Sequence, residues 1–289
     1  NVNDVGTQQE LNDRVSAAAL IGTLQTSYTN FHYLRDIWRR TTEKDALLGI
    51  GMTGIGSGRV QQLSLEEAAT LAVETNKYYA TEIGVNPAAR ITTVKPSGTT
   101  SCVLGTSSGV HAWHNDYYIR RIRVGKNEAI YTYLSIHHPE LLEDDFFKPD
   151  SQAIISIPQQ APEGGILRHE TSLDLLERVK DIYERWIIPG HNGGNNTHNV
   201  SCTVSVKDDE WDEVGEWMWE NREYYNGMSV LPYFGGSYKQ APFEDIDEKT
   251  FEGMFIGLKE VDLSGVVEVI DNTNLTGELA CAGGACEIT

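Results

Sequence analysis

Apolar residues along this chain follow two spacings, one typical of helices and one typical of short buried strands. The clearest helical pattern begins at the sequence Thr7-Gln-Gln-Glu10, which has the form of a capping box and is followed by Leu11, Val15, Ala18 and Ala19 at helical spacing. This pattern predicts a helix over about residues 8–25. Comparable patterns predict helices near residues 30–45, 64–84, 128–137, 172–186 and 208–225.

Short apolar runs rich in β-branched residues lie between these predicted helices. We interpret residues 89–94, 153–158, 200–206 and 228–232 as strands. The repeated order of helix, short strand and polar loop predicts an α/β fold with mainly parallel strands. Active sites of such folds lie at the carboxyl ends of the strands. Strand signals weaken from about residue 244, and the end of the chain is predicted to be a mobile tail.

A hydroxyl-rich turn follows the predicted strand at 89–94. Pro96 cannot donate a main-chain hydrogen bond, so we expect the strand to end there. The turn itself consists of Ser97, Gly98, Thr99, Thr100 and Ser101. If a helix begins here, its free N–H groups and the hydroxyls would point to one spot and bind an anion, most naturally phosphate, to which Lys95 could add a positive charge. The alternative is a capped strand-to-helix turn that binds nothing.

Residues 46–58 (ALLGIGMTGIGSG) contain the spacing Gly49-x-Gly51-x-x-Gly54, which formally matches a dinucleotide-binding fingerprint. The match is weak, because no sufficiently long strand precedes the first glycine and no helix opens directly on the third. Glycines at this spacing also suit a strand that lies against another main chain or a ligand, and we favour that interpretation.

The composition narrows the classes of function. The chain has 289 residues and a formal net charge of −19, which argues against a nucleic-acid partner. An anionic ligand would therefore need a local basic site. Besides Lys95, the candidates are Arg120, Arg121 and Arg123, although we favour structural ion pairs for this cluster. No apolar run is long enough for a membrane span and no secretory signal is visible, so a cytoplasmic protein without a membrane partner is expected.

A polar loop at 190–199 (GHNGGNNTHN) is predicted to frame a cleft. It contains His191 and His198, but no second pair of residues at metal-ligand spacing accompanies them. We interpret both as loop histidines, and no metal site is predicted.

The chain has four cysteines, too few for a disulfide scaffold. Cys281 and Cys286 stand near the end of the chain, joined by Ala-Gly-Gly-Ala, a linker that adopts many main-chain angles. Such a pair on a mobile tail suits a dithiol–disulfide shuttle that passes electrons on. The alternatives to a dithiol shuttle are that the pair forms half of a metal site, or that the two cysteines have no joint role. Cys102 and Cys202 lie in or beside predicted buried segments, and we interpret them as inert core thiols.

Together, the phosphate-type turn, the glycine-rich segment and the terminal cysteine pair resemble the large subunit of ribonucleotide reductases. The resemblance is greatest to the adenosylcobalamin-dependent (class II) enzymes, and among these to the ribonucleoside-triphosphate reductases. The segments that carry it span nearly the whole chain in family order: QQELNDRVSAAALIGTLQTSYTNFHYLR, GIGMTGIGSG, RITTVKPSGTTS, GTSSGVH, NVSCTVSVKDDEWDEV, SVLPYFGGSYKQAPFE and ELACAGGACEI.

The resemblance implies a ten-stranded α/β barrel in two halves, of which this chain would be the C-terminal half. Residues 1–265 would form this half-barrel with the phosphate-binding turn, and residues 266–289 a flexible C-terminal tail with the redox dithiol. In the family, the radical-bearing cysteine, its Asn and Glu neighbours and two reducing cysteines lie upstream of the segment that Asn1 begins. Neither Cys102 nor Cys202 stands in a matching position, so the chain alone is expected to be inactive.

The resemblance also implies roles and partners. Residues 97–101 would hold the substrate phosphates, while Cys281 and Cys286 would re-reduce an active-site disulfide and be reduced in turn by thioredoxin or a similar protein. Ribonucleotides would be reduced to 2′-deoxyribonucleotides by a thiyl-radical reaction that adenosylcobalamin initiates. The cofactor would be bound mainly by the N-terminal half, which is the expected partner. Two other functions stay open: a sugar-phosphate-binding α/β barrel enzyme with an incidental tail, and a non-catalytic subunit that completes a barrel or binds thioredoxin.

Overall fold

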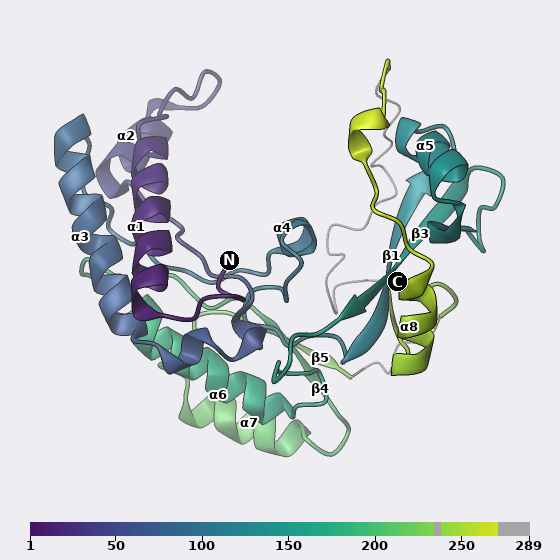
Figure 1. The fold of residues 1–289 in the computed structure, drawn as a ribbon. Coiled ribbons are helices and arrows are strands. Elements are labelled where there is room, and N and C mark those ends of the chain that lie inside the picture. Colours follow the sequence, from purple (N-terminus) through teal and green to yellow (C-terminus); the bar gives the residue numbers. More distant parts are fainter. Residues whose placement is uncertain (234–237, 271–289) are drawn as a thin grey trace. The chain divides into compact units, whose positions relative to one another are not determined.

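The computed structural model describes residues 1–233 and 238–270, which form two compact units (Figure 1). Unit 1 consists of Asn1–Trp113 and Gly164–Tyr233. Unit 2 consists of His114–Glu163 and the described residues from 238 onward. Residues 1–265, which the resemblance predicts to form one half-barrel, thus divide between two units. Their place in half of a barrel stays a prediction.

Two long helices of unit 1, α1 (Gln8–Gln25) and α3 (Leu65–Ile83), pack side by side (Figure 1). α1 begins at the predicted capping box, in which the hydroxyl of Thr7 and the carboxylate of Glu10 each accept a hydrogen bond from the other residue's main chain. α3 ends at Gly84, whose φ of 73° is a conformation that glycine adopts without a steric cost. Both helices were predicted from the sequence.

A buried amide connects these helices to the segment that leads to the predicted phosphate turn. Asn76 of α3 donates to the hydroxyl of Thr23 on α1 over 2.9 Å and accepts from the main-chain N–H of Ala88 over 2.9 Å. Because these polar groups lie in the interior, each needs a hydrogen-bond partner there. The two bonds of Asn76 therefore fix where the extended segment after Ala88 begins.

Strand pairing in unit 1 is mainly parallel, as predicted, with one antiparallel bridge between Arg90 and His191. Isolated bridges join Ile50 to Thr92 and Val94 to Val200, and β4 (Thr203–Val206) pairs with β5 (Ser229–Pro232). The predicted strand at 89–94 is thus a buried extended segment held by single bridges rather than by a continuous ladder.

Further helices of unit 1 are α2 (Asp36–Asp45), the short α4 (Gly98–Val103), α6 (Ser172–Ile182) and α7 (Trp211–Glu220). α6 continues into a π-helical turn at Tyr183–Ile187, and short 3-10 turns occur at Ile55–Ser57 and Val60–Gln62. The core between helices and strands includes Leu11, Val15, Ile55, Leu65, Ile91, Val94, Leu176, Val179, Trp186 and Val204. The predicted helices at 30–45 and 208–225 are shorter in the structure than the sequence pattern indicated.

Unit 2 is built on an antiparallel sheet with the strand order β2-β3-β1-β6. The strands are β1 (Tyr117–Gly125), β2 (Leu142–Asp144), β3 (Gln152–Gln160) and β6 (Phe243–Asp245). β1 and β3 pair along their whole length, and helices α5 (Ala129–His137) and α8 (Glu248–Ile256) belong to the same unit, as do 3-10 turns at Pro139–Leu141 and Leu263–Gly265.

The prediction of mainly parallel strands is wrong for unit 2. β1 was not predicted, because its three arginines interrupt the run of apolar residues that is expected of a buried strand. The predicted strand at 153–158 lies within β3, which pairs antiparallel with β1 and β2. Among the described helices, none is long and apolar enough to cross a membrane.

Candidate functional site

The predicted phosphate turn lies at the end of the buried segment Ile91, Thr92, Thr93 and Val94. Trp186, which is fully buried, donates its indole N–H to the carbonyl of Thr93 over 3.1 Å. This bond holds the segment against the core. After Pro96 the chain turns at once into α4. The conditional prediction that a helix begins within the turn is confirmed, although this helix has only six residues.

One hydroxyl joins the turn to two other segments. Thr53 Oγ1 bonds to Ser97 Oγ, donates to the carbonyl of Ser107 over 3.0 Å and accepts from the N–H of Gly109 over 3.1 Å. A threonine hydroxyl has a single proton. Since the carbonyl of Ser107 can only accept, that proton goes to Ser107, and the hydroxyl of Ser97 must donate to Thr53.

These bonds decide which groups of residues 97–101 can meet a ligand. The amide of Ser97 donates to Ser108 Oγ over 2.9 Å and that of Thr100 to the carbonyl of Ser97 over 2.8 Å. The hydroxyl of Ser101 donates to the carbonyl of Gly98 over 2.7 Å. Ser97 and Ser101 therefore use their hydroxyl protons to hold the turn together.

The remaining donors gather at the tip of the turn. Within residues 1–233 and 238–270, the amide N–H groups of Gly98 and Thr99 have no hydrogen-bond acceptor. The side chains of Thr99 and Thr100 are exposed. Two amides and two hydroxyls are thus available to an anion, and they belong to the residues that the sequence analysis selected.

The return loop after α4 lies close against the turn, and this requires a glycine. Gly109 has φ +54°, and a Cβ atom there would stand 2.5 Å from the carbonyl oxygen of Lys95. Any other residue would push the loop away from the turn. The same argument applies at Gly54 (φ +88°), where a Cβ would stand 2.4 Å from the hydroxyl of Thr106. The interpretation that the glycine-rich segment lies against another part of the chain is confirmed.

Basic side chains surround the polar loop at 190–199. Lys95 Nζ lies 2.5 Å from Asn199 Oδ1, and Arg90 bonds to the carbonyl of Asn196. His198 Nδ1 lies 3.1 Å from the carbonyl of Thr92. Burial lowers the pKa of His198, and the nearby charges of Arg90 and Lys95 lower it further. At neutral pH this histidine is therefore uncharged, and the positive charge comes from the lysine and the arginine.

A second half-buried histidine, His111, bonds to the main chain of the return loop. His111 Nδ1 lies 3.0 Å from the carbonyl of Ser108, and Nε2 accepts from the N–H of Thr203 over 3.1 Å. Nδ1 therefore carries the proton and the ring is neutral. Burial is the main cause that lowers the pKa of His111, and the charge of Arg178 contributes. Arg178 itself donates to the carbonyl of Val110 over 3.0 Å and forms two bonds to the Glu170 carboxylate, at 2.7 and 2.6 Å.

The described cysteines differ from the prediction in one case. Cys202 is buried, and burial raises the pKa of its thiol to about 12, so it is inert at neutral pH as predicted. Cys102 is exposed, and its interpretation as a core thiol is wrong. It lies in α4, beyond the point where Pro96 ends the buried segment. Cys281 and Cys286 lie outside the described residues, so their predicted role stays a prediction.

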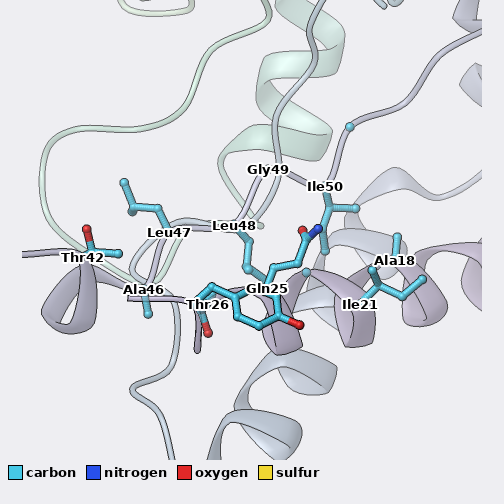
Figure 2. A pocket seen from close by; sticks show the side chains of 13 residues that line it. Ala18, Ile21, Gln25, Thr26, Thr42, Ala46, Leu47, Leu48, Gly49 and Ile50 are labelled. Carbon is cyan, nitrogen blue, oxygen red and sulfur yellow. The ribbon is translucent and has the colours of Figure 1, made fainter. Parts of the chain in front are cut away.

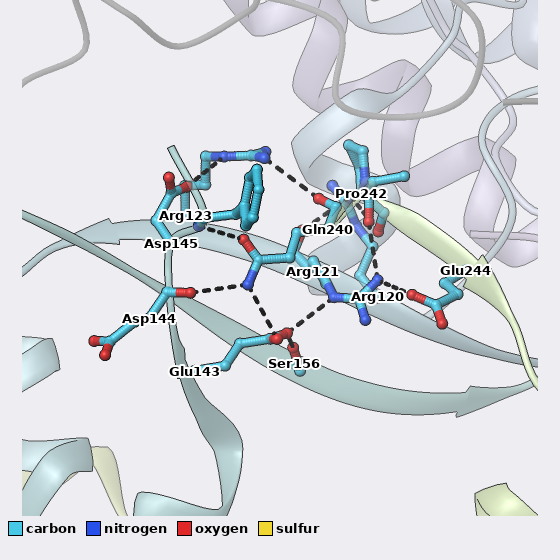
Figure 3. A network of polar contacts seen from close by, with 12 residues as sticks. Arg120, Arg121, Arg123, Glu143, Asp144, Asp145, Ser156, Gln240, Pro242 and Glu244 are labelled. Carbon is cyan, nitrogen blue, oxygen red and sulfur yellow. Dashed lines mark hydrogen bonds and ion pairs between the residues drawn. The ribbon is translucent and has the colours of Figure 1, made fainter. Parts of the chain in front are cut away.

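The arginine cluster of β1 forms structural ion pairs (Figure 3). Arg121 contacts Glu143 at 3.0 Å and Glu244 at 2.5 Å, and Arg123 contacts Asp145 at 3.1 Å. The guanidinium of Arg120 lies 4.4 Å from the centre of the Phe243 ring. The favoured interpretation, structural ion pairs, is confirmed for Arg121 and Arg123.

No family model matches the chain. Individual curated proteins, however, match it over most of its length. The chain is 27% identical over 297 residues to an adenosylcobalamin-dependent ribonucleoside-triphosphate reductase of Lactobacillus acidophilus, a match that covers 89% of this chain and 38% of the relative. It is 29% identical over 219 residues to the protein of the same name from Lactobacillus leichmannii, covering 75% and 29%. The predicted resemblance is confirmed.

A solved structure gives the same result for the fold. A crystal structure of a B12-dependent (class II) ribonucleotide reductase superimposes with a TM-score of 0.71 at 22% identity and covers 85% of this chain and 37% of that one. The chain thus spans less than two fifths of the length of the L. acidophilus relative and of this structure.

We expect the stability of the chain to depend on the neutral state of His111. Its folded-state pKa is lowered below the ordinary value of about 6.5, so the unfolded chain takes up the proton first as the pH falls. The free energy of unfolding should therefore be insensitive to this group above pH 7 and fall as the pH drops below about 6.5.

The measurement is urea unfolding of the wild-type chain and of His111→Gln between pH 7.5 and pH 5. The variant removes the titrating group, so its free energy of unfolding should fall less steeply over this interval. Equal slopes for the two proteins would contradict the assignment of a buried neutral imidazole.

Proposed function

We propose that this chain is the part of an adenosylcobalamin-dependent ribonucleotide reductase that holds the substrate's phosphates, and that its substrates are ribonucleoside triphosphates. The similarity to reductases of this name over 89% of the chain supports the proposal. The main structural support for phosphate binding is the tip of the turn. There, the amides of Gly98 and Thr99 have no acceptor, and the side chains of Thr99 and Thr100 are exposed.

The chain would act as the C-terminal half of a ten-stranded barrel and would need the rest of the protein for turnover. Two facts support this division. The chain covers only 38% of the L. acidophilus relative. Of its described cysteines, Cys202 has a thiol pKa of about 12 and is protonated at neutral pH. By the resemblance, Cys102 would not stand at the position of the family's catalytic cysteine.

Neither His111 nor the two pockets beside α1 and α2 offers a fitting site for adenosylcobalamin. Both ring nitrogens of His111 are already bonded to the main chain. The pockets, of about 410 and 710 Å³, are small for a corrin with its attached nucleotides (Figure 2 shows the first). We therefore assign the cofactor mainly to the rest of the protein, and no step assigned to these residues depends on it.

The residues of this chain would bind and position the substrate and bring in electrons. The open amides and hydroxyls of residues 98–100 would hold the phosphates, and Lys95 would add a charge. Cys281 and Cys286 would pass an electron pair to an active-site disulfide, which becomes two thiols while the terminal pair becomes a disulfide. Thioredoxin or a similar dithiol protein would then reduce the terminal pair.

Removing the hydroxyls at the tip should weaken substrate binding. In the complete enzyme, the double substitution Thr99→Val and Thr100→Val should raise KM for a ribonucleoside triphosphate by about tenfold or more, since a hydrogen bond to a charged group contributes about 1.5–3 kcal/mol. Steady-state kinetics measures the change. The control is Thr81→Val, at an exposed threonine of α3 that bonds only within its own helix. A KM equal to that of the control would contradict the phosphate assignment.

Replacing the terminal cysteines should separate the candidate functions. With Cys281→Ser and Cys286→Ser, turnover of the complete enzyme with thioredoxin should fall to background, while a small dithiol such as dithiothreitol should still support it. Cys102→Ser, at an exposed cysteine, is the matched control and should keep its activity.

Unchanged thioredoxin-dependent turnover would contradict the shuttle. A sugar-phosphate enzyme with an incidental tail would show no effect of these substitutions, and a non-catalytic subunit would show no turnover in any arm. Ribonucleotide reduction by the purified 289-residue chain alone would contradict the proposed division of the barrel.

A further inference from the structure

Asn199 connects the polar loop to the segment that leads into the phosphate turn. Its main-chain oxygen accepts from the N–H of Val94 over 3.2 Å and from the hydroxyl of Thr93 over 3.1 Å. Its side-chain oxygen accepts from Lys95 Nζ over 2.5 Å, and its side-chain nitrogen donates to the carbonyl of Gly227 over 3.3 Å. One residue therefore holds three successive positions shortly before the turn.

The partners of the Asn199 side chain fix the orientation of its amide. An ammonium can only donate and a carbonyl can only accept, so the amide oxygen must face Lys95 and the nitrogen must face Gly227. Asparagine forms both bonds and stays uncharged. An aspartate could also hold the lysine, but its carboxylate would neutralise the ammonium and could not donate to Gly227.

The positive charge of Lys95 is not balanced by a carboxylate. Within the described part of the chain, the exposed Lys95 forms no ion pair, and neither does Arg90, whose guanidinium bonds to the carbonyl of Asn196. Arg121 of β1, by contrast, is held between two carboxylates. The charge of Lys95 is therefore available to an anionic ligand.

The sequence around the turn also lacks acidic residues. The chain has 42 aspartates and glutamates, but three segments contain none of them: residues 46–65, 83–115 and 185–207. These segments run side by side, since bridges join Ile50 to Thr92 and Val94 to Val200. A polyanion that approaches the turn would meet little repulsion from them, although the net charge of the chain is −19.

We propose that Asn199 is a positioning residue for the binding of the substrate's phosphates. Its neutral amide holds the ammonium of Lys95 beside the turn without cancelling the charge, so that the lysine can meet a phosphate. Lys95 lies three positions before Gly98, which places their Cα atoms within about 11 Å of one another. A polyphosphate has several charged groups, so one can occupy the tip of the turn while another meets the lysine. The inference rests on the proposed function, because it requires residues 98–100 to bind phosphate.

A double-mutant cycle tests whether Asn199 acts through Lys95. The measurement is the Kd of inorganic tripolyphosphate for the full 289-residue chain, by isothermal titration calorimetry at about 0.1 M ionic strength. Lys95→Met should raise this Kd by about tenfold, and Asn199→Leu by about threefold or more, since the lysine is then no longer held. The double variant should bind no more weakly than Lys95→Met alone. Effects that multiply in the double variant, or an unchanged Kd in either single variant, would overturn the proposal.

Asn199→Asp supplies a second test in a variant that keeps the size of the side chain. Its carboxylate still holds the lysine but cancels the charge, so the Kd of tripolyphosphate should rise by about tenfold or more at about 0.1 M ionic strength. The ratio to the wild-type Kd should fall toward one at about 1 M ionic strength, where charges are screened within about 3 Å.

The matched control is Asn195→Asp, which adds the same charge at an exposed residue of the same loop that does not hold the lysine. Its Kd should rise by less than about twofold, because the added charge is screened by the solvent. Equal rises in the two aspartate variants would show that the contact with Lys95 does not matter. A ratio for Asn199→Asp that is the same at low and high salt would show structural damage, and either result would overturn the proposal.

The same titrations separate this inference from the proposed function. If tripolyphosphate binds the wild-type chain and the Thr99→Val, Thr100→Val double substitution weakens it, whereas Asn199→Asp binds like Asn195→Asp, the phosphate site stands and this inference fails. If tripolyphosphate does not bind the wild-type chain, the phosphate site fails and this inference fails with it.

Discussion

The hydroxyl of Thr53 is the interaction on which the candidate site depends. It forms hydrogen bonds with Ser97, Ser107 and Gly109. Because the hydroxyl has a single proton, which goes to the carbonyl of Ser107, it must accept the other two bonds. The turn, its return loop and the glycine-rich segment are held as one piece by this atom. Because the hydroxyl protons of Ser97 and Ser101 are used in these bonds, the donors left open on the turn are confined to residues 98–100.

The sequence was informative wherever the signal was local. Thr7 and Glu10 predicted the start of α1, Gly84 the end of α3, and Pro96 the end of the buried segment before the turn. Each of these residues acts on neighbours a few positions away, through a cap or a missing N–H. The helix start within residues 97–101 also follows from a local pattern, a strand end followed by small hydroxyl residues. That these residues bind phosphate stays a prediction.

The features that the sequence did not reveal depend on distant partners. Thr53 is 44 positions from Ser97, and nothing in the sequence around it indicates that contact. β1 was missed because Arg121 and Arg123 suit a strand only when Glu143, Asp145 and Glu244 are placed beside them. The exposure of Cys102 likewise follows from the return loop, which covers Ser101 but not the residue after it.

The most direct measurement is a titration of the ¹⁵N-labelled chain with inorganic tripolyphosphate at constant ionic strength, followed by the amide resonances of the turn. The account predicts that the resonances of Gly98 and Thr99 shift first and furthest, and that Thr53→Val, which removes the hydroxyl that holds Ser97, abolishes the shifts. Unperturbed resonances at Gly98 and Thr99, or shifts that persist unchanged in the Thr53→Val chain, would contradict it.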